Sequence, residues 1–153
     1  MTTELSHDLA AANVLSFMSS PRAGRRKGAT ATIVNEATGN RITVRFRRPN
    51  DRNGNPFKAV LVDLMTGSDN TSDFTFLGTL KGENVIISPK SRVAGEKANM
   101  AGAVLNWTIN HAAKDDLRTV RVLHSGSCGR CGRKLTVPES IDTGLGPECI
   151  KHA

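Results

Sequence analysis

Five short β-prone runs, separated by gaps that are too short for a helix, constrain the fold of this chain most strongly. Two of them lie in ATATIVNEATGNRITVRFRR and join around Thr38-Gly39-Asn40, and the other three are FKAVLVDLM, FTFLGTL and NVIIS. Parallel neighbours in a sheet need a crossover of roughly a dozen residues, whereas antiparallel neighbours are joined by short turns. The five runs therefore predict an antiparallel meander.

The second run of the hairpin alternates between apolar and polar residues. Ile42, Val44 and Phe46 are separated by polar residues at positions 41, 43, 45 and 47. Successive side chains of a strand point to opposite faces of a sheet. The pattern predicts one face turned to a core and a second face that carries Arg41, Arg45 and Arg47.

Two segments show helical signals. Residues 6–19 begin at Ser6, a suitable N-cap, and stop before Pro21, which predicts an N-terminal helix. Residues 94–113 give the stronger prediction, because two neighbouring rows recur at helical spacing. These rows are Met100, Val104, Trp107 and His111, and Ala101, Leu105, Thr108 and Ala112. We expect Trp107 in the core and a further strand at residues 117–124.

The order of these elements predicts an α+β fold. We expect an antiparallel β-meander flanked by an N-terminal helix and one long helix, with a C-terminal treble-clef-like zinc module. The expected parts are an N-terminal helix at 1–20, a basic linker at 21–28, an α+β domain at 29–124 and the zinc module at 125–153.

Basic residues are concentrated in one quarter of the chain. The 153 residues carry a net charge of +7. Residues 21–58 hold ten basic residues against Glu36 and Asp51, a net +8, and the remaining eleven basic and twelve acidic residues give −1. Such a field favours phosphate-rich or acidic partners, although a solubility role explains the same numbers. Aromatic residues make up only 4%, which disfavours a base-stacking platform.

Composition also bounds the compartment. The chain shows no apolar run near the roughly 20 residues of a membrane span and no secretory signal at its N-terminus. Its three cysteines cannot pair evenly, and two of them have the C-x2-C spacing that indicates metal or redox chemistry in a reduced compartment. We therefore expect a cytoplasmic protein without a membrane partner.

All three cysteines lie near the C-terminus at metal-ligand spacing, in the pattern Cys128-x2-Cys131-x17-Cys149-x2-His152. Glycines follow the first two cysteines and permit a tight knuckle. Three thiolates and one imidazole fill a tetrahedron and leave no position for water, which predicts a structural Zn²⁺ site without a catalytic role. A zinc deaminase would also need an H-x-E sequence, which the chain lacks.

The fourth ligand of this site has two candidates. Gly146-Pro147 can begin a helix that places Cys149 and His152 on one face, which favours His152. His124 lies four residues before Cys128 and is the alternative. Spacing alone leaves both residues open as the ligand that completes the tetrahedron.

The cysteine segment resembles a short zinc module of unknown function that occurs in bacteriophage and actinobacterial proteins. The shared marks are the Cys-Gly-x-Cys-Gly-Arg opening, Leu135-Thr136, Pro138-Glu139-Ser140 and the Gly-x-Gly-Pro-x-Cys close, which together span residues 128–149. The resemblance implies that the three cysteines bind zinc and that the protein comes from a mobile element. If a bacteriophage encodes it, the expected location is the cytoplasm of the host cell. It implies no activity.

Two functions are open. The first is an accessory protein that binds nucleic acid through phosphate contacts with little sequence specificity, because arginine forks suit phosphate oxygens. The second is a protein–protein factor that modulates host machinery or defence and docks by its basic face or N-terminal helix. We expect no enzymatic activity and no small-molecule substrate, and a structural role in a virion is a further alternative. The candidate nucleic-acid contacts are Arg22, Arg25, Arg26, Lys27, Arg41, Arg45, Arg47, Arg48, Arg130, Arg133 and Lys134.

Overall fold

The computed structural model describes residues 7–21, 25–55, 57, 59–66, 73–131, 133–136, 138–146 and 149, with only the backbone of residues 25–27. Its strands are β1 (His7–Asp8), β2 (Arg25–Asn35), β3 (Arg41–Arg48), β4 (Val60–Met65), β5 (Phe74–Lys81), β6 (Asn84–Ile87) and β7 (Val120–His124). Its helices are α1 (Val14–Met18), α2 (Gly95–Ala113) and α3 (Pro138–Thr143), and a 3₁₀ turn, η1, covers Ala11–Asn13.

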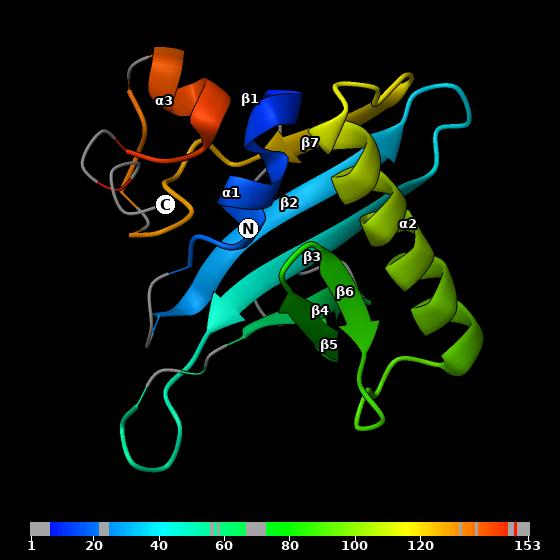
Figure 1. Ribbon diagram of the computed structural model, residues 1–153, viewed down its shortest axis with the longest axis vertical. Coiled ribbons are helices and arrows are strands. Elements are labelled where there is room, and N and C mark those ends of the chain that lie inside the picture. Colours follow the sequence, from blue (N-terminus) through cyan, green and yellow to red (C-terminus); the bar gives the residue numbers. More distant parts are fainter. Residues whose placement is uncertain are drawn as a thin grey trace.

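The strands of the described ranges form one antiparallel sheet in the order β1-β7-β2-β3-β4-β5-β6 (Figure 1). Strands β2 to β6 are neighbours in the order in which they follow along the chain, so the predicted meander is confirmed. After α2 the chain returns as β7, which pairs with the other edge of β2, and β1 pairs with β7. The molecule is therefore a mixed α+β fold, as its sequence predicts.

The β2–β3 hairpin has the two faces that its alternation predicts. Ala31 pairs with Val44 across the hairpin, and Val44 and Phe46 are fully buried on one face of the sheet. On the opposite face the hydroxyl groups of Thr32 and Thr43 share a hydrogen bond of 2.7 Å. The apolar face of β3 is thus the one that builds the core.

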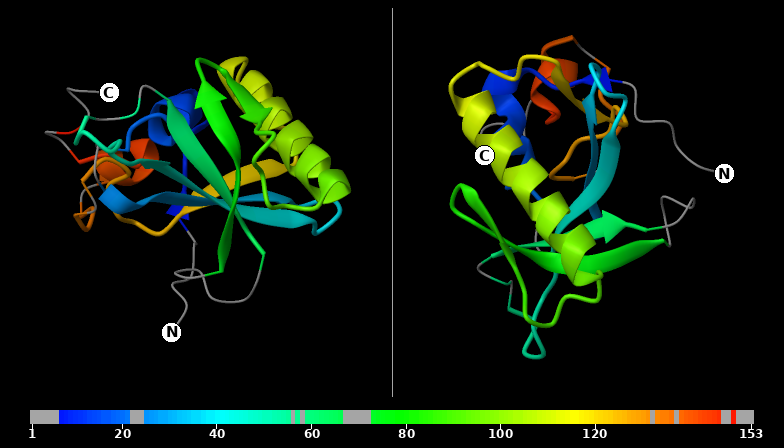
Figure 2. Two further views of the ribbon diagram at one scale, coloured as in Figure 1. Left: turned by 90° about the horizontal axis from the view of Figure 1, so that it is seen from below. Right: turned by 90° about the vertical axis from the view of Figure 1, so that its right-hand side faces the viewer.

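The main core lies between this face of the sheet and the helices α1 and α2, which lie on the same side of it (Figure 2). Side chains that are less than 2% exposed come from the sheet and from both helices. They are Phe46 and Val62 of the sheet, Phe17 and Met18 of α1, and Leu105 of α2. Each such side chain contributes about 1.5–3 kcal/mol by burial.

The predicted long helix is confirmed as α2, but the expected core position of Trp107 is wrong. Leu105 and its neighbours in the second row are buried, whereas Met100 remains 46% exposed. Trp107 is only partly buried, and its indole stacks on the imidazole of His111 with ring centroids 3.9 Å apart.

Small residues explain which row of α2 is buried. A Cβ on Gly102 would come within 2.9 Å of the Ile87 side chain, so the helix approaches β6 through its alanine and glycine positions. Ala98 and Ala101 are also buried. Close approach on this side turns the larger row that contains Trp107 toward one flank of the helix.

The N-terminal segment differs from its prediction. Only Val14–Met18 are α-helical, and His7–Asp8 pair with β7. The amide of Leu9 extends this pairing by donating to the carbonyl of Val122 at 2.8 Å. The backbone of this stretch therefore satisfies its polar groups against a sheet edge, where a helix would satisfy them internally. Ser6, the predicted cap, lies outside the described residues.

The predicted isolation of the N-terminal helix by a linker is also corrected. β2 begins at Arg25, within the range expected to be linker. Val14, Phe17 and Met18 are at most 1% exposed and belong to the main core. α1 is thus a packed part of the domain. Among the described residues, no helix combines the length and the apolar character that a membrane crossing requires.

Candidate metal centre and basic end

The three cysteines come together at one point. Cys128 and Cys131 lie in the loop that follows β7, and Cys149 lies after α3. Their sulfur atoms are all within 4.8 Å of one another, and no disulfide joins these described residues. Thiolates around a tetrahedral Zn²⁺ lie roughly 3.8 Å apart, given a Zn–S distance of about 2.3 Å. The cluster therefore has the dimensions of a metal-binding site.

A short turn holds the first two cysteines. The amide of Cys128 donates to the carbonyl of Arg133 at 2.7 Å, and Ser127 forms an antiparallel bridge with Lys134. These bonds close the loop across residues 128–133. The same turn carries the basic residues Arg130, Arg133 and Lys134.

The thiols differ in their readiness to ionise. Burial disfavours the charged form of Cys128, but amide groups, led by that of Gly146 at 3.3 Å from the sulfur, outweigh it and lower its pKa to about 7. Burial raises the pKa of Cys149 to about 11, and hydrogen bonds with Cys131 and Cys128 add to this effect. A divalent cation among the three sulfurs would supply the positive charge that favours all three thiolates.

The module around the cysteines has little apolar core of its own. Leu135 and Leu145 are buried against Cys128 and Cys149, with Ile141 partly buried beside them, and this cluster is separate from the main core. Burying two leucines contributes roughly 3–6 kcal/mol before the entropic cost of ordering the segment. A bound metal ion would therefore add greatly to the stability of this part.

The N-terminal segment attaches the cysteine module to the sheet. The ring of Phe17 lies against two glycines of the module: a Cβ on Gly129 would be 2.8 Å from it, and a Cβ on Gly144 would clash with it. The amide of Gly129 donates to the carbonyl of Gly144 at 2.8 Å. A second link comes from the side-chain amide of Asn13, which donates to the carbonyl of Asp142 at 3.1 Å.

His124 does not join the sulfur cluster. The amide of Gly126 donates to Nδ1 at 3.0 Å, so Nε2 carries the ring proton and donates to the carbonyl of Ile141 at 2.7 Å. Neither ring nitrogen then has a lone pair available for a metal ion, which removes the support for His124 as fourth ligand. His152 and the predicted helix start at Pro147 lie outside the described residues, and both stay predictions.

Comparison with known proteins concerns this same part of the chain. Residues 121–153 match a family of unknown function, DUF6011. The matched range holds the cysteine cluster and α3, and it begins within β7. No curated protein and no solved structure matches the chain. The match supports a small cysteine module, consistent with the resemblance seen in the sequence, and it supplies no activity.

The basic residues predicted near the start of β2 lie at an end of the sheet. Arg22 is outside the described residues, and the side chains of Arg25, Arg26 and Lys27 are not described. The backbone of Arg25 pairs with Arg48 at the end of β3. Arg48 is partly buried, and its Nε has no hydrogen-bond partner in the described part of the chain.

Two arginines of the predicted basic face are paired with a buried acid. Both oxygens of Asp63, which is 1% exposed, accept hydrogen bonds from the guanidinium groups of Arg45 and Arg47, at 2.6–3.1 Å. Arg45 also lies 4.5 Å above the ring of Phe74. This cluster corrects the expectation that Arg45 and Arg47 are free for phosphate, because they share one negative charge and are fixed in place.

Two arginines near β7 are engaged in ion pairs. Arg121 pairs with Asp8 and with Glu36, the latter at 3.5 Å, and Arg118 lies 3.5 Å from Asp116. Of the candidate nucleic-acid contacts whose side chains are described, five are partly or fully exposed and have no ion pair to another described residue. They are Arg41 at the hairpin turn, Arg48 at the end of β3, and Arg130, Arg133 and Lys134 on the cysteine turn.

Two features of this region escaped the sequence analysis. Asp63 interrupts the apolar run VLVDLM at the position that pairs with Arg45, and this single acid was the signal for the buried cluster. Helix α3 begins at Pro138 with Glu139 in its first turn, which is a standard helix start.

Proposed function

We propose that the protein is an accessory protein that binds nucleic acid through one basic end. This basic end comprises the start of β2, the end of β3 and the cysteine turn, with Arg25, Arg26, Lys27, Arg48, Arg130, Arg133 and Lys134 as its cations. The observation that carries the proposal is the convergence of these separate basic segments on one end of the molecule. A concentrated positive surface of this kind favours a polyphosphate partner.

The convergence rests on contacts and on the path of the chain. A Cβ on Gly129 of the cysteine turn would lie 2.9 Å from Oγ of Ser20. Only four residues separate Ser20 from Arg25, so the chain spans at most about 18 Å between them. These two distances keep the cysteine turn close to the start of β2, and both segments lie at the same end of the molecule (Figures 1 and 2).

The side chains of this end favour contacts to the sugar-phosphate backbone. Arginine presents a planar fork that suits phosphate oxygens, and lysine adds a mobile point charge. Aromatic residues are scarce, and the single tryptophan lies on α2, away from this end. We therefore expect weak sequence specificity and strong dependence on salt.

We further propose that the metal is a structural Zn²⁺ in a treble-clef-like setting, with Cys128, Cys131, Cys149 and His152 as ligands. Thiolate-rich tetrahedral sites favour zinc, and four protein ligands leave no open position. A bacteriophage or actinobacterial origin rests on the motif resemblance and belongs to the same proposal.

Binding is tested by fluorescence anisotropy with labelled 20-nucleotide DNA and RNA, single-stranded and duplex, after nuclease treatment of the protein. Between 50 and 300 mM KCl we expect the logarithm of the association constant to fall linearly with the logarithm of salt concentration, with a slope of about −3 to −5. The variant Arg133→Gln/Lys134→Gln should reduce this slope by about 1–2, since each lost phosphate contact removes about one unit.

The double variant Lys90→Gln/Arg92→Gln is the matched control, because it removes two exposed cations from the loop before α2. It should leave the slope unchanged. Absence of binding at 50 mM KCl, or equal effects of the two double variants, would refute the proposed surface. A host protein that co-purifies after nuclease treatment and contacts this end would favour the protein–protein alternative.

A further inference from the structure

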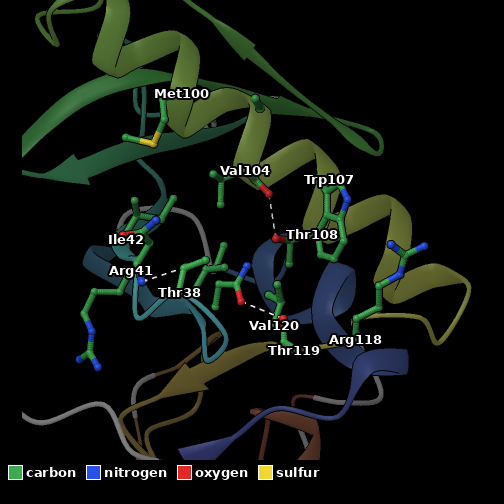
Figure 3. Close-up of a pocket in the computed structure, with 14 residues that line it drawn as sticks. Thr38, Arg41, Ile42, Met100, Val104, Trp107, Thr108, Arg118, Thr119 and Val120 are labelled. Atoms are coloured by element: carbon green, nitrogen blue, oxygen red, sulfur yellow. Dashed lines mark hydrogen bonds between the residues drawn. The ribbon is translucent and has the colours of Figure 1, made fainter.

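A pocket of about 840 Å³ opens between α2 and the far end of the sheet. Residues from α2, from the β2–β3 hairpin and from the start of β7 line it (Figure 3). It lies on the side of α2 that carries Val104 and Trp107, the residue that the sequence analysis expects in the core. Pockets of roughly 300–1,000 Å³ are the usual size for small organic ligands.

The pocket results from the way α2 is supported. The helix packs against β6 through its small residues and against α1 and η1, so it bridges these elements. The hairpin end of β2 and β3 is left beneath the flank that carries Val104 and Trp107. Ile33, Ile42 and Val120 of the sheet face the same space. The result is a concave site with an apolar floor and an aromatic wall.

Two hydroxyl groups of the lining already donate hydrogen bonds within the protein. The hydroxyl of Thr108 donates to the carbonyl of Val104 at 2.7 Å, and the hydroxyl of Thr119 donates to the side-chain oxygen of Asn35 at 2.8 Å. These bonds fix the lining and leave its centre apolar. A ligand would therefore meet a preformed surface and would need an apolar body.

The charged groups that line the pocket are both cationic. Arg41 and Arg118 lie on opposite sides of it (Figure 3). Both side chains are exposed, and the 3.5 Å pair between Arg118 and Asp116 is a weak surface contact that a ligand can replace. Arg118 also has a positive φ of 56°, a costly backbone conformation for a residue with a side chain, of the kind found at ligand sites.

We propose that this pocket binds a small organic anion with an apolar body, in which an acyl chain or aromatic ring lies against Trp107 and Val104 and a carboxylate or phosphate meets Arg118. Arg118 is the primary anion contact, because it lines the same side of the pocket as Trp107, whereas Arg41 lies on the other side (Figure 3). This inference is independent of nucleic-acid binding, and it departs from the sequence-based expectation of no small-molecule substrate.

The protein carries its own reporter for this site. Trp107 is the single tryptophan and the chain has no tyrosine, so emission above 300 nm comes from the pocket wall alone. Titration with decanoate and with 3-phenylpropanoate, neither of which emits in this range, separates an acyl from an aryl ligand. We expect a saturable change in Trp107 emission with at least one anion and binding at least about fivefold weaker for its neutral alcohol, decanol or 3-phenylpropanol.

Two matched pairs of variants locate the ligand. Arg118→Gln should weaken binding by about 3- to 10-fold, whereas Arg133→Gln, an exposed cation of the cysteine turn, should leave it unchanged. Ala103→Phe fills the pocket and should abolish the emission change, whereas Asn99→Phe places the same ring on an exposed helix position outside the lining. Circular dichroism of each variant confirms that the fold is retained.

Several results would overturn the proposal. One is the lack of a saturable change with either anion, and another is equal affinity for the neutral alcohols. A third is full binding by a folded Ala103→Phe variant. Analytical ultracentrifugation at the assay concentration tests whether a second copy of the chain occupies the pocket. A dimer that becomes a monomer in the Ala103→Phe variant would assign the pocket to that second copy and overturn the small-anion proposal.

Discussion

Gly28 occupies a position in β2 where backbone conformation and space both exclude a side chain. Its φ is +56°, and a Cβ would run into the carbonyl oxygen of Phe46 on the neighbouring strand. Gly39, in the hairpin turn, also has a positive φ, +78°, but a Cβ there would have no neighbour within 4 Å. A side chain at Gly28 would therefore meet both backbone strain and steric overlap, whereas a side chain at Gly39 would meet backbone strain alone.

We expect Gly28→Ala to lower the free energy of unfolding by about 3 kcal/mol, and Gly39→Ala by only about 1 kcal/mol, the cost of the left-handed conformation alone. Chemical denaturation followed by circular dichroism measures both. Equal losses for the two variants would show that the clash at β3 is relieved by a small shift of the strand, and that strain alone matters at both positions.

Asp63 shows what sequence reasoning at the residue scale can miss. The alternation of β3 correctly assigned Arg45 and Arg47 to one face, but alternation does not reveal which residue of the next strand pairs with them. The strand register places Asp63 beside Arg45, and the carboxylate accepts four hydrogen bonds there. These hydrogen bonds offset the desolvation cost of burying its charge. A face that looks cationic in one strand is therefore partly neutralised by its neighbour.

At the scale of elements, His124 joins β7 to α3. Its ring contacts Phe17 of α1 and His7 of β1, with centroids 5.6 and 5.7 Å apart. Burial lowers the pKa of His124, and the positive charge of nearby His7 adds to this, against the opposing effect of the Ile141 carbonyl. The ring is thus neutral in the folded protein over a pH range in which it takes up a proton in the unfolded chain.

The sign of the pH dependence follows. Below about pH 6.5, the ordinary pKa of histidine, the unfolded state binds more protons at this site than the folded state, so the free energy of unfolding falls as pH decreases, by up to about 1.4 kcal/mol per pH unit. His124→Gln retains an amide donor and an acceptor but does not titrate. We expect denaturation curves between pH 5 and 7 to show a shallower fall for this variant, and parallel falls would argue against His124 as the source.

The elements themselves were largely predictable. The hairpin, the later strands and α2 follow from local periodicity, because each buries one regular face. The N-terminal segment was mispredicted because its helical pattern competes with a sheet edge that forms only after residues 120–124 are in place. The sequence predicts two neighbouring rows of residues on α2, but it does not predict which row is buried. That depends on the close approach of Gly102 to Ile87, which are neighbours only in the folded chain.

At the scale of the whole molecule, we expect the cysteine module and the N-terminal segment to lose stability together. The proposed zinc ion would contribute roughly 10–16 kcal/mol of binding free energy, which the small core of the module cannot replace. Because Phe17 contacts both the module and the main core, we expect removal of that ion by a chelator to expose residues 9–20 as well as the module. Hydrogen exchange measured by mass spectrometry, with and without chelator, tests this expectation.

In that experiment, amides of β3 to β5 should keep their protection, since they pair only within the meander. The variant Cys149→Ser should reproduce the effect of chelation without a chelator. Faster exchange confined to residues 125–146, with residues 9–20 unchanged, would show that the N-terminal segment is held by the sheet alone.

The cysteine cluster could be predicted from the sequence, whereas the pocket could not. Ligand spacing brought the three cysteines together correctly, because a knuckle and a short return are local in geometry. The pocket was not foreseen, since it depends on where α2 leaves the sheet uncovered. Trp107 was interpreted as core from its helical spacing, which cannot distinguish a buried row from a row that lines a hollow.

The position of Phe17 has a consequence for the synthesis of the chain. Strands β2 to β6 can pair as they emerge from the ribosome, because each finds its partner in the strand just made. Residues 7–20 cannot do so: Leu9 waits for Val122, and Asn13 waits for Asp142, 129 residues later. Residues 7–20 are therefore made well before the residues they dock on, and the apolar helical turn of α1 cannot complete its contacts until residues 122–142 have been made.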